Sequence, residues 1–358
     1  MSRRSPQDAS TSGDERRPSL AELDRRLVEL LNARASHPQA RRDDVADARR
    51  WEALCKRLKR LNRGPLSAET LEAIYRELLC GSRQARQPTR VAFLGPLYSY
   101  SHLAALRRFG QAAELVPVHS IAAVFDEVVA GHCQYGLVPL ANSTDGRIAD
   151  TLDSFARQPV RISGEVPLPI RHYLLGRGQR SAIRVVCSKP QALSQCRQWL
   201  AQHLPQARLQ ETASTTEAAK MAADDPTVAA VASREAGVHY GLDVLAEGIE
   251  DRRGNVTRFA VIGGELPSRT GRDKTALMFE LAHTVGALAR AMALFPKHGL
   301  NLTWVESFPL PETPNEFLFF VELEGHLDDP AVRNAIEALR KKTTRLEVLG
   351  CYPIAAVE

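Results

Sequence analysis

The chain has 358 residues, of which 44% are apolar and 25% are charged, a composition typical of a globular protein with two or three cores. No run approaches the roughly eighteen consecutive apolar residues of a membrane span, and the polar start lacks the apolar core of a secretory signal. We therefore expect a cytoplasmic protein with no membrane partner. The scattered cysteines, without CxxC pairs or zinc-type histidine spacing, predict neither a disulfide scaffold nor a bound metal.

The positive charge is concentrated near the N-terminus. Up to Arg90, Lys and Arg outnumber Asp and Glu by 20 to 13, whereas the remainder carries 27 against 29. Such an excess is compatible with a nucleic-acid partner, with a small-anion site or with a solvated helical face. The basic residues follow helical patterns, without interleaved aromatics or a recognition motif, which favours a solvated face and no nucleic-acid partner. Without a GxGxxG or P-loop motif, no nucleotide cofactor is expected.

Residues 1–17 are rich in Ser, Arg and Asp and predict a disordered tail. A helical domain is expected over 18–88. It begins with a capping box formed by Ser19 and Glu22, and leucines then recur at helical spacing until Pro38. Two further helices are predicted, over 45–61 and after the Asn62 to Pro65 break. Three helices in this length make a poor monomeric core, so we expect a homodimer or a higher homo-oligomer.

Between residues 89 and 266, short β-rich runs alternate with helical patterns. This alternation predicts an α/β domain with a mainly parallel sheet, folded as two lobes around a cleft. The expected strands are Val91 to Leu94, Leu115 to Val118, Gly136 to Leu140, Ile183 to Cys187, Val228 to Ala232 and Phe259 to Ile262. The expected helices are Ser101 to Phe109, Ile121 to Val129, Pro190 to Gln202 and Thr216 to Ala223.

The last segment, residues 273–358, follows the break at Pro267 to Gly271. Its pattern reads β-α-β-β-α-β, which is typical of a ferredoxin-like fold. The expected elements are Ala276 to Leu281, Val285 to His298, Leu302 to Glu306, Phe317 to Glu322, Pro330 to Lys341 and Leu346 to Tyr352.

Polar segments follow several predicted strands, at the edge where open α/β sheets bind ligands. Each segment alone reads as a turn with a helix cap, but together they predict one binding cleft. They are GPLYSYSH from Gly95, VPLANS from Val138, SKPQ from Ser188, ASTT from Ala213 and NVTRF from Asn255.

These segments resemble, in order and spacing, the signatures of the prephenate dehydratases, over about Arg90 to Gly264. The resemblance implies a two-lobed, periplasmic-binding-protein-like fold that converts prephenate to phenylpyruvate, water and carbon dioxide without a cofactor. It implies that Thr257 assists departure of the ring hydroxyl and that Arg258 pairs with a carboxylate, in a way that Lys could not mimic. The other implied residues are Asn142 and Ser143 as catalytic, and Ser99, Tyr100, Ser101, Gln191, Ser214, Thr215 and Phe259 as substrate-binding.

Two residues depart from that pattern. Ala141 stands where the family has Glu, and Tyr98 stands where Gly is usual. Gly would permit a positive φ or a close ligand approach, so Tyr98 indicates an altered backbone or a partly filled pocket. Two alternatives stay open: decarboxylation of prephenate without loss of the hydroxyl, and a catalytically weak paralogue that binds prephenate or an amino acid and regulates a partner.

Two N-terminal segments are LAELDRRLVELLNARA, from Leu20, and LNRGPLSAETLEAIYRELLCGSRQAR, from Leu61. They resemble the chorismate mutase domain that precedes the dehydratase in bifunctional members, over about Arg17 to Arg86. The resemblance implies conversion of chorismate to prephenate, with Arg17, Arg34, Arg50 and Ser82 at the chorismate site. Pro38 interrupts the first helix early, Trp51 stands where Glu is expected, and Arg86 stands where Gln or Glu is usual. Helices that serve dimerisation alone are therefore the alternative.

The C-terminal segment resembles an ACT domain. The resemblance implies an allosteric L-phenylalanine site marked by Gly286, Ala287, Leu288, Glu306 and Ser307. Phe308 stands where inhibited family members carry Arg, and Ala289 stands where Val is common, so weakened or absent inhibition by phenylalanine is expected. A domain kept only for assembly is the alternative, because a ferredoxin-like pattern specifies no ligand.

Overall fold

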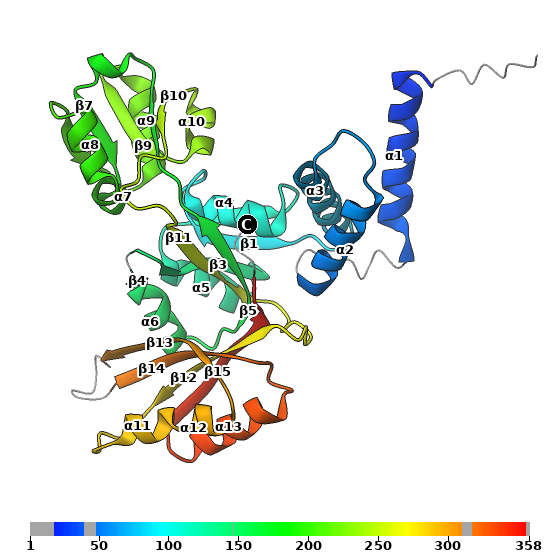
Figure 1. The fold of residues 1–358 in the computed structure, drawn as a ribbon, viewed down its shortest axis with the longest axis vertical. Coiled ribbons are helices and arrows are strands. Elements are labelled where there is room, and N and C mark those ends of the chain that lie inside the picture. The colour runs from blue at the N-terminus through cyan, green and yellow to red at the C-terminus, as the bar shows by residue number, and fades with distance from the viewer. Residues whose placement is uncertain (1–17, 39–47, 145, 310–316, 356–358) are drawn as a thin grey trace, which may run out of the picture. The chain divides into compact units, whose positions relative to one another are not determined.

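The computed structural model describes residues 18–38, 48–144, 146–309 and 317–355 (Figure 1). The tail expected over 1–17, Arg17 included, lies outside these ranges, as does the expected start of the second helix. Residues 1–42 and 43–358 form separate units, each described by itself. In the first unit, α1 spans Leu20–Ser36 and begins with the predicted capping box. The Ser19 N–H donates to Glu22 Oε2 over 2.8 Å and the Glu22 N–H donates to Ser19 Oγ over 3.3 Å.

The second unit begins with two helices, α2 (Ala48–Leu61) and α3 (Ala68–Arg86). They pack through a small apolar cluster in which Leu54 and Leu58 lie against Leu79. Ser67 caps α3 by accepting from the Thr70 N–H at 3.1 Å. A side-chain cap of this kind satisfies a backbone donor that the helix itself leaves unpaired.

The first α/β lobe holds β1 (Arg90–Leu94), β2 (Glu114–Val118), β3 (Tyr135–Asn142), β5 (Ile162–Pro169) and β11 (Val256–Gly263), in the order β5-β11-β3-β1-β2. It also holds the short β4 (Gly146–Arg147), α4 (Tyr100–Phe109), α5 (Ile121–Val129) and α6 (Ala149–Arg157). β1 is parallel to β2 and β3, but β11 is antiparallel to both β3 and β5. The expectation of a mainly parallel sheet was wrong here, because the chain leaves this lobe through β5 and returns through the adjacent β11.

The second lobe has its own sheet, in the order β10-β6-β9-β7-β8. Its strands are β6 (Tyr173–Gly176), β7 (Val185–Ser188), β8 (Arg208–Glu211), β9 (Val228–Ala232) and β10 (Asp243–Glu247), and its helices are α7 (Pro190–Gln195), α8 (Arg197–His203), α9 (Thr215–Asp224), α10 (Arg234–Tyr240) and the 3-10 turn Arg180–Ala182. The single helix expected over Pro190 to Gln202 is broken at Cys196, where the backbone leaves helical geometry (φ −113°, ψ 12°).

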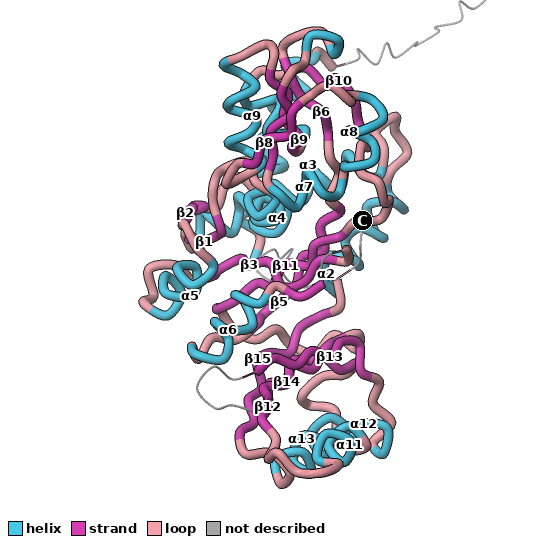
Figure 2. The backbone as a smooth tube through the Cα atoms, turned by 90° about the vertical axis from the view of Figure 1, so that its left-hand side faces the viewer, coloured by secondary structure: helices cyan, strands magenta, loops and turns pink. Residues whose placement is uncertain are grey.

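The C-terminal elements are β12 (Asp273–Glu280), α11 (Ala287–Met292), α12 (Leu294–Lys297), β13 (Leu302–Pro309), β14 (Phe317–Glu324), α13 (Pro330–Arg340) and β15 (Arg345–Pro353). The strand order β13-β14-β12-β15 is ferredoxin-like, as predicted. Helices α11 to α13 cover one face of the sheet (Figure 2). At the other edge, Gly350 of β15 pairs with Ile162 of β5, so this sheet continues into that of the first lobe. Within the described ranges, no helix is both long and apolar enough to cross a membrane.

Candidate active site

The loop between β1 and α4 holds Tyr98 in an uncommon backbone conformation. Gly95 and Pro96 are joined by a cis peptide bond, and Tyr98 has a left-handed φ of 65°, a conformation that few non-glycine residues adopt. The Tyr98 N–H donates to His102 Nδ1 over 3.0 Å, and its ring stacks on His239 of the second lobe with centroids 3.8 Å apart. The bulky residue therefore keeps a glycine-like backbone while its ring contacts α10.

The next polar residues, Ser99, Tyr100 and Ser101, form the N-terminal end of α4. Ser99 Oγ accepts from the His102 N–H over 3.3 Å and so caps the helix. The Tyr100 hydroxyl donates to the Arg171 carbonyl over 2.7 Å, and Ser101 is buried. Their side chains are engaged by the protein, whereas the helix N-terminus that they form carries the partial positive charge that favours an anionic ligand.

Asn142 and Thr257 meet at the ends of β3 and β11, which pair these two residues in register. Asn142 Nδ2 donates to Thr257 Oγ1 over 2.8 Å and to Asn255 Oδ1 over 2.9 Å. Asn142 Oδ1 accepts from the Thr144 N–H over 2.8 Å. The amide is thus held at both ends, and because the Thr257 oxygen accepts a hydrogen bond, its own O–H can donate to a further acceptor.

Ser143 lies beside this pair, but its side chain binds the backbone at the start of β11. Its Oγ accepts from the Val256 N–H over 2.9 Å and lies 3.4 Å from the Gly254 carbonyl oxygen. Phe259, two residues beyond Thr257, is 2% exposed and packs in the core under α4. These two predicted site residues therefore shape the strand ends.

Arg258 lies elsewhere, because consecutive side chains of a strand point to opposite faces. Its guanidinium donates to Glu322 Oε1 over 2.7 Å and to Glu165 Oε2 over 3.0 Å. Burial by itself would lower the pKa of Arg258, but Glu322 and Glu165 outweigh that effect and raise it. The carboxylates that Arg258 binds are thus the protein's own, and the structure does not bring it together with Thr257.

The predicted residues of the second lobe lie at helix starts. Gln191 is exposed on the first turn of α7. Ser214 caps α9 by accepting from the Glu217 N–H over 3.0 Å, and Thr215 is buried in its first turn. As in α4, the hydroxyl of the cap is engaged by the helix itself, while the helix start is suited to an anion.

Three residues that sequence reasoning did not select join the site. Asn255 Nδ2 donates to Gln195 Oε1 over 3.0 Å, and Gln195 Oε1 lies 2.9 Å from His172 Nε2. Asn255 could have been found, since it opens the NVTRF segment. Gln195 and His172 carry no local signal, because each becomes part of the site only through the folding of the two lobes.

The residues predicted for chorismate lie on the three N-terminal helices. Arg34 is in the last turn of α1, Arg50 is on α2, and Ser82 on α3 donates to the Leu78 carbonyl over 2.6 Å. Arg17 lies outside the described residues. The Ser82 hydroxyl is therefore hydrogen-bonded within its own helix, α3.

The residues predicted for an effector lie on α11 and β13. Gly286 caps α11 with a left-handed φ of 74°, and Ala287 and Leu288 form its first turn. Glu306 and Ser307 on β13 both contact Arg147 of β4. The guanidinium lies 3.4 Å from Glu306 Oε2 and 2.5 Å from the Ser307 carbonyl oxygen. Since Gly146 of β4 pairs with Asn142, Arg147 joins β13 to the hairpin that carries the candidate catalytic amide.

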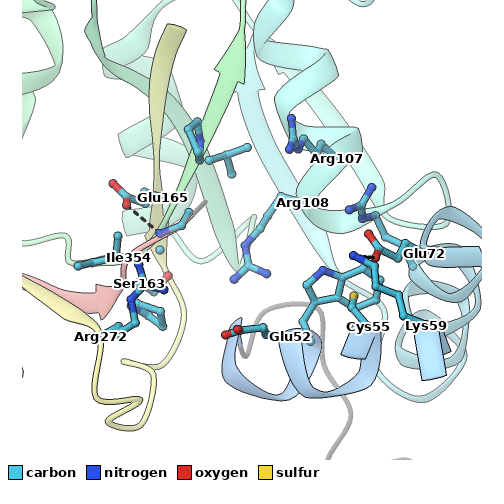
Figure 3. Close-up of a pocket in the computed structure, with 17 residues that line it drawn as sticks. Glu52, Cys55, Lys59, Glu72, Arg107, Arg108, Ser163, Glu165, Arg272 and Ile354 are labelled. Atoms are coloured by element: carbon cyan, nitrogen blue, oxygen red, sulfur yellow. Dashed lines mark hydrogen bonds and ion pairs between the residues drawn. The ribbon is translucent and has the colours of Figure 1, made fainter. Parts of the chain in front are cut away.

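A separate cavity of about 380 Å³ lies between α2, α3, α4 and β5 (Figure 3). Arg76, Arg107, Arg108 and Arg272 line it together with Glu165, and Lys59 pairs with Glu72 at 3.2 Å. None of the residues predicted for a substrate, chorismate or effector site lines it. The cavity is therefore not part of the site formed by Asn142 and Thr257.

Comparison with known protein families assigns the N-terminal helices and the two α/β lobes. Residues 91–266 match the prephenate dehydratase family and residues 17–87 match chorismate mutase type II. A bifunctional chorismate mutase/prephenate dehydratase from Stutzerimonas stutzeri is 36% identical over 355 residues, which cover 95% of this chain and 97% of the relative.

Two solved structures share the fold of about three quarters of the chain. Prephenate dehydratase from Arthrobacter aurescens, in complex with L-Phe, has a TM-score of 0.69 at 32% identity and covers 74% of this chain and 90% of its own. GqqA, described as a novel type of quorum quenching acylase, has a TM-score of 0.68 at 27% identity, with 74% of this chain and 98% of its own covered. The fold alone therefore does not decide the reaction, and the site residues must.

The matched segments and the polar strand ends define an α/β enzyme of the prephenate dehydratase class, preceded by chorismate mutase helices. The 36% identity to bifunctional enzymes over nearly the full length of the chain identifies the family more closely than the two domain matches do. The chain belongs to the bifunctional chorismate mutase/prephenate dehydratase family.

Proposed function

We propose that the chain converts prephenate to phenylpyruvate, water and carbon dioxide at the strand ends where Asn142 and Thr257 meet. One observation carries the assignment of the acid: Asn142 Nδ2 donates to Thr257 Oγ1 over 2.8 Å. With its oxygen engaged as an acceptor, Thr257 directs its own proton towards a leaving hydroxyl, which then departs as water.

The remaining steps require that the two carboxylates of prephenate be held in position, and they require no covalent bond between enzyme and substrate. As the carboxylate on the ring leaves as carbon dioxide, its electron pair enters the ring and the hydroxyl departs, so that the ring becomes aromatic. The N-terminal turns of α4 and α9, which contain Ser99 to Ser101 and Ser214 to Thr215, are suited to the two carboxylates. We assign Arg258 to holding β11, because Glu165 and Glu322 occupy its guanidinium.

Substitution at Thr257 tests this assignment. We expect Thr257→Val, which keeps the shape and removes the hydroxyl, to lower kcat by about 10²-fold or more, as loss of a general acid does. Thr257→Ser retains the hydroxyl and should keep most of the activity. The measurement is phenylpyruvate formation from prephenate, read by the absorbance of its enolate in alkali.

The product separates this proposal from its alternatives. A dihydroaromatic product would show decarboxylation with retention of the hydroxyl, the outcome that replacement of the family's Glu by Ala141 leaves open. Prephenate binding without turnover would support a regulatory paralogue. Equal kcat values for wild type and Thr257→Val would overturn the role of Thr257.

The domain boundaries belong to the same proposal, with a mutase domain at 18–88, a periplasmic-binding-protein-like dehydratase domain at 89–266 and an ACT domain at 273–358. We assign conversion of chorismate to prephenate to the first, supported by the match over 17–87. L-phenylalanine is the effector assigned to the ACT domain, with Gly286, Ala287 and Leu288 on α11 and Glu306 and Ser307 on β13.

Weak inhibition by phenylalanine is part of this proposal. Phe308, where inhibited members carry Arg, packs partly buried against the apolar core, and so offers no charge to the carboxylate of an amino acid. Assembly as a homodimer or a higher homo-oligomer, and a cytoplasmic location, complete the proposal.

A further inference from the structure

The two connections between the lobes cross beside His172. One segment runs from β5 to β6 through Ile170 to His172, and the other returns from β10 to β11 through Asn255. Backbone hydrogen bonds join them, from the Ile170 N–H to the Asn255 carbonyl over 2.8 Å and from the Ile249 N–H to the His172 carbonyl over 3.2 Å. His172 is 2% exposed at this crossing, where its ring lies among groups of both lobes.

A continuous hydrogen-bonded path leads from this ring to Thr257. His172 Nε2 lies 2.9 Å from Gln195 Oε1, at the end of α7, and Gln195 Oε1 also accepts from Asn255 Nδ2 over 3.0 Å. Asn255 Oδ1 accepts from Asn142 Nδ2, which also donates to Thr257 Oγ1. Each group in the path thereby fixes the orientation of the next amide.

The path also fixes the imidazole tautomer. Because Gln195 Oε1 can only accept, the proton of a neutral His172 ring must lie on Nε2. The Tyr100 hydroxyl lies 2.7 Å from the Arg171 carbonyl oxygen and 3.2 Å from His172 Nδ1, so its single proton can be shared between the two and Nδ1 can accept while Nε2 donates. Burial lowers the pKa of His172, against the weaker opposing effects of Gln195 and Glu250, so the neutral ring is favoured.

We infer that His172 is a positioning residue for Thr257: its Nε2–H orients Gln195, which through Asn255 and Asn142 directs the Thr257 hydroxyl to the substrate. The inference rests on the proposed function of Thr257. Since Gln195 belongs to the second lobe and Asn142 and Thr257 to the first, the path is complete only when the lobes have the arrangement seen here. The reactive hydroxyl is thereby oriented only in that arrangement.

Substitutions of His172 in the full chain test the inference, because they distinguish loss of the Nε2–H donor from loss of side-chain volume. We expect His172→Leu to lower kcat for prephenate by about 10- to 100-fold, the range for a displaced catalytic group, with KM changed by less than about 3-fold, because His172 itself does not contact the substrate. His172→Gln, whose amide can place a donor near the position of Nε2, should recover much of the loss. His326→Leu is the matched control, since His326 is a buried histidine of the C-terminal sheet region that lies outside the path.

A second measurement does not depend on turnover or on a folded variant. The ¹⁵N chemical shifts of labelled histidine in the wild-type protein should show the His172 proton on Nε2, the nitrogen that faces Gln195 Oε1. A proton on Nδ1, or a fall in kcat that His326→Leu reproduces at equal loss of unfolding temperature, would overturn the inference. A wild-type protein that makes no phenylpyruvate would instead overturn the proposed function, while leaving the tautomer measurement valid.

Discussion

Thr257 and Arg258 are neighbours on β11, yet they lie in different environments. Arg258 and Lys274 face Glu165 and Glu322 in a cluster whose two positive and two negative charges balance. Glu322 is fully buried and also accepts from the Tyr352 hydroxyl over 2.7 Å. A balanced buried cluster of this kind adds little net stability, but loss of one member leaves a charge without compensation.

We therefore expect Glu322→Gln to destabilise the protein strongly. The substitution keeps the shape of the side chain and leaves the cluster with one excess positive charge next to β11. Removing one partner of a buried pair costs about 3–5 kcal/mol in free energy of unfolding. Urea titration followed by circular dichroism measures the loss.

Glu324→Gln is the matched control for this change. Glu324 lies on the same strand two residues away but is exposed, and its Oε1 accepts only from Asn301 Nδ2 among the hydrogen bonds found here, over 3.3 Å. Neutralising it should change the free energy of unfolding by less than about 0.5 kcal/mol, as is usual at the surface. Equal losses in the two variants would mean that the cluster does not depend on Glu322.

Among the elements, the sequence patterning failed to predict the strands β5, β6, β8 and β10, of which β5 is central to the structure. Its sequence, ISGEVPLP, contains a glycine, a buried glutamate and two prolines, which normally argue against an inner strand. Its partner β15 pairs with it only at Gly350 and Ile162, so the prolines lie beyond that ladder. In contrast, β3 and β11 show clear apolar runs and were predicted.

The junction of β15 with β5 depends on Gly350. A Cβ atom added at this residue would lie 2.1 Å from the Ile162 carbonyl oxygen, a backbone atom that cannot yield without moving the strand. Gly350→Ala should therefore separate the two sheets locally and lower the free energy of unfolding by about 1–3 kcal/mol, as overpacking does. Thermal or urea unfolding reports the change.

Gly81→Ala provides the same chemical change in open space. Gly81 lies within α3, and a Cβ atom there would have no neighbour within 4 Å. Because alanine is the better helix former by about 1 kcal/mol, this variant should be as stable as the wild type or more so. A stable Gly350→Ala protein would show that β15 and β5 can separate without cost.

The candidate site was predictable to the extent that its residues follow strands in recognisable segments. Asn142, Ser143 and Thr257 come together as expected because β3 and β11 pair in register. Arg258 belonged to the same segment, but its environment is set by Glu322, which lies 64 residues away on β14. His172 and Gln195 have no neighbouring motif, so only the folded arrangement of the lobes reveals them.

At the scale of the whole molecule, the sheet shared by the first lobe and the C-terminal strands carries both the Asn142–Thr257 pair and β13. Arg147 adds a second connection, from β13 to the hairpin that carries Asn142. A ligand that moved β13 would therefore act on that hairpin directly. The N-terminal helix α1 carries a stripe of leucines, Leu20, Leu23, Leu27, Leu30 and Leu31. A single helix cannot bury such a stripe by itself.

That stripe predicts assembly through a second copy of the chain. We expect the double substitution Leu23→Glu and Leu27→Glu to lower the molar mass of the assembly, because two charges would then lie in an apolar helix interface. Light scattering coupled to size-exclusion chromatography, over a series of protein concentrations, measures the mass. Dehydratase kcat should stay within about 3-fold of wild type, since Asn142 and Thr257 lie in the other unit.

Asn32→Glu on the same helix is the control, because a helical repeat of 100° per residue places it about 150° from the stripe. It adds charge to α1 without entering the leucine face and should leave the mass unchanged. If both variants keep the wild-type mass, α1 does not mediate assembly. If the leucine variant dissociates and also loses chorismate turnover while prephenate turnover persists, the mutase site needs residues from two copies and the dehydratase site needs only one.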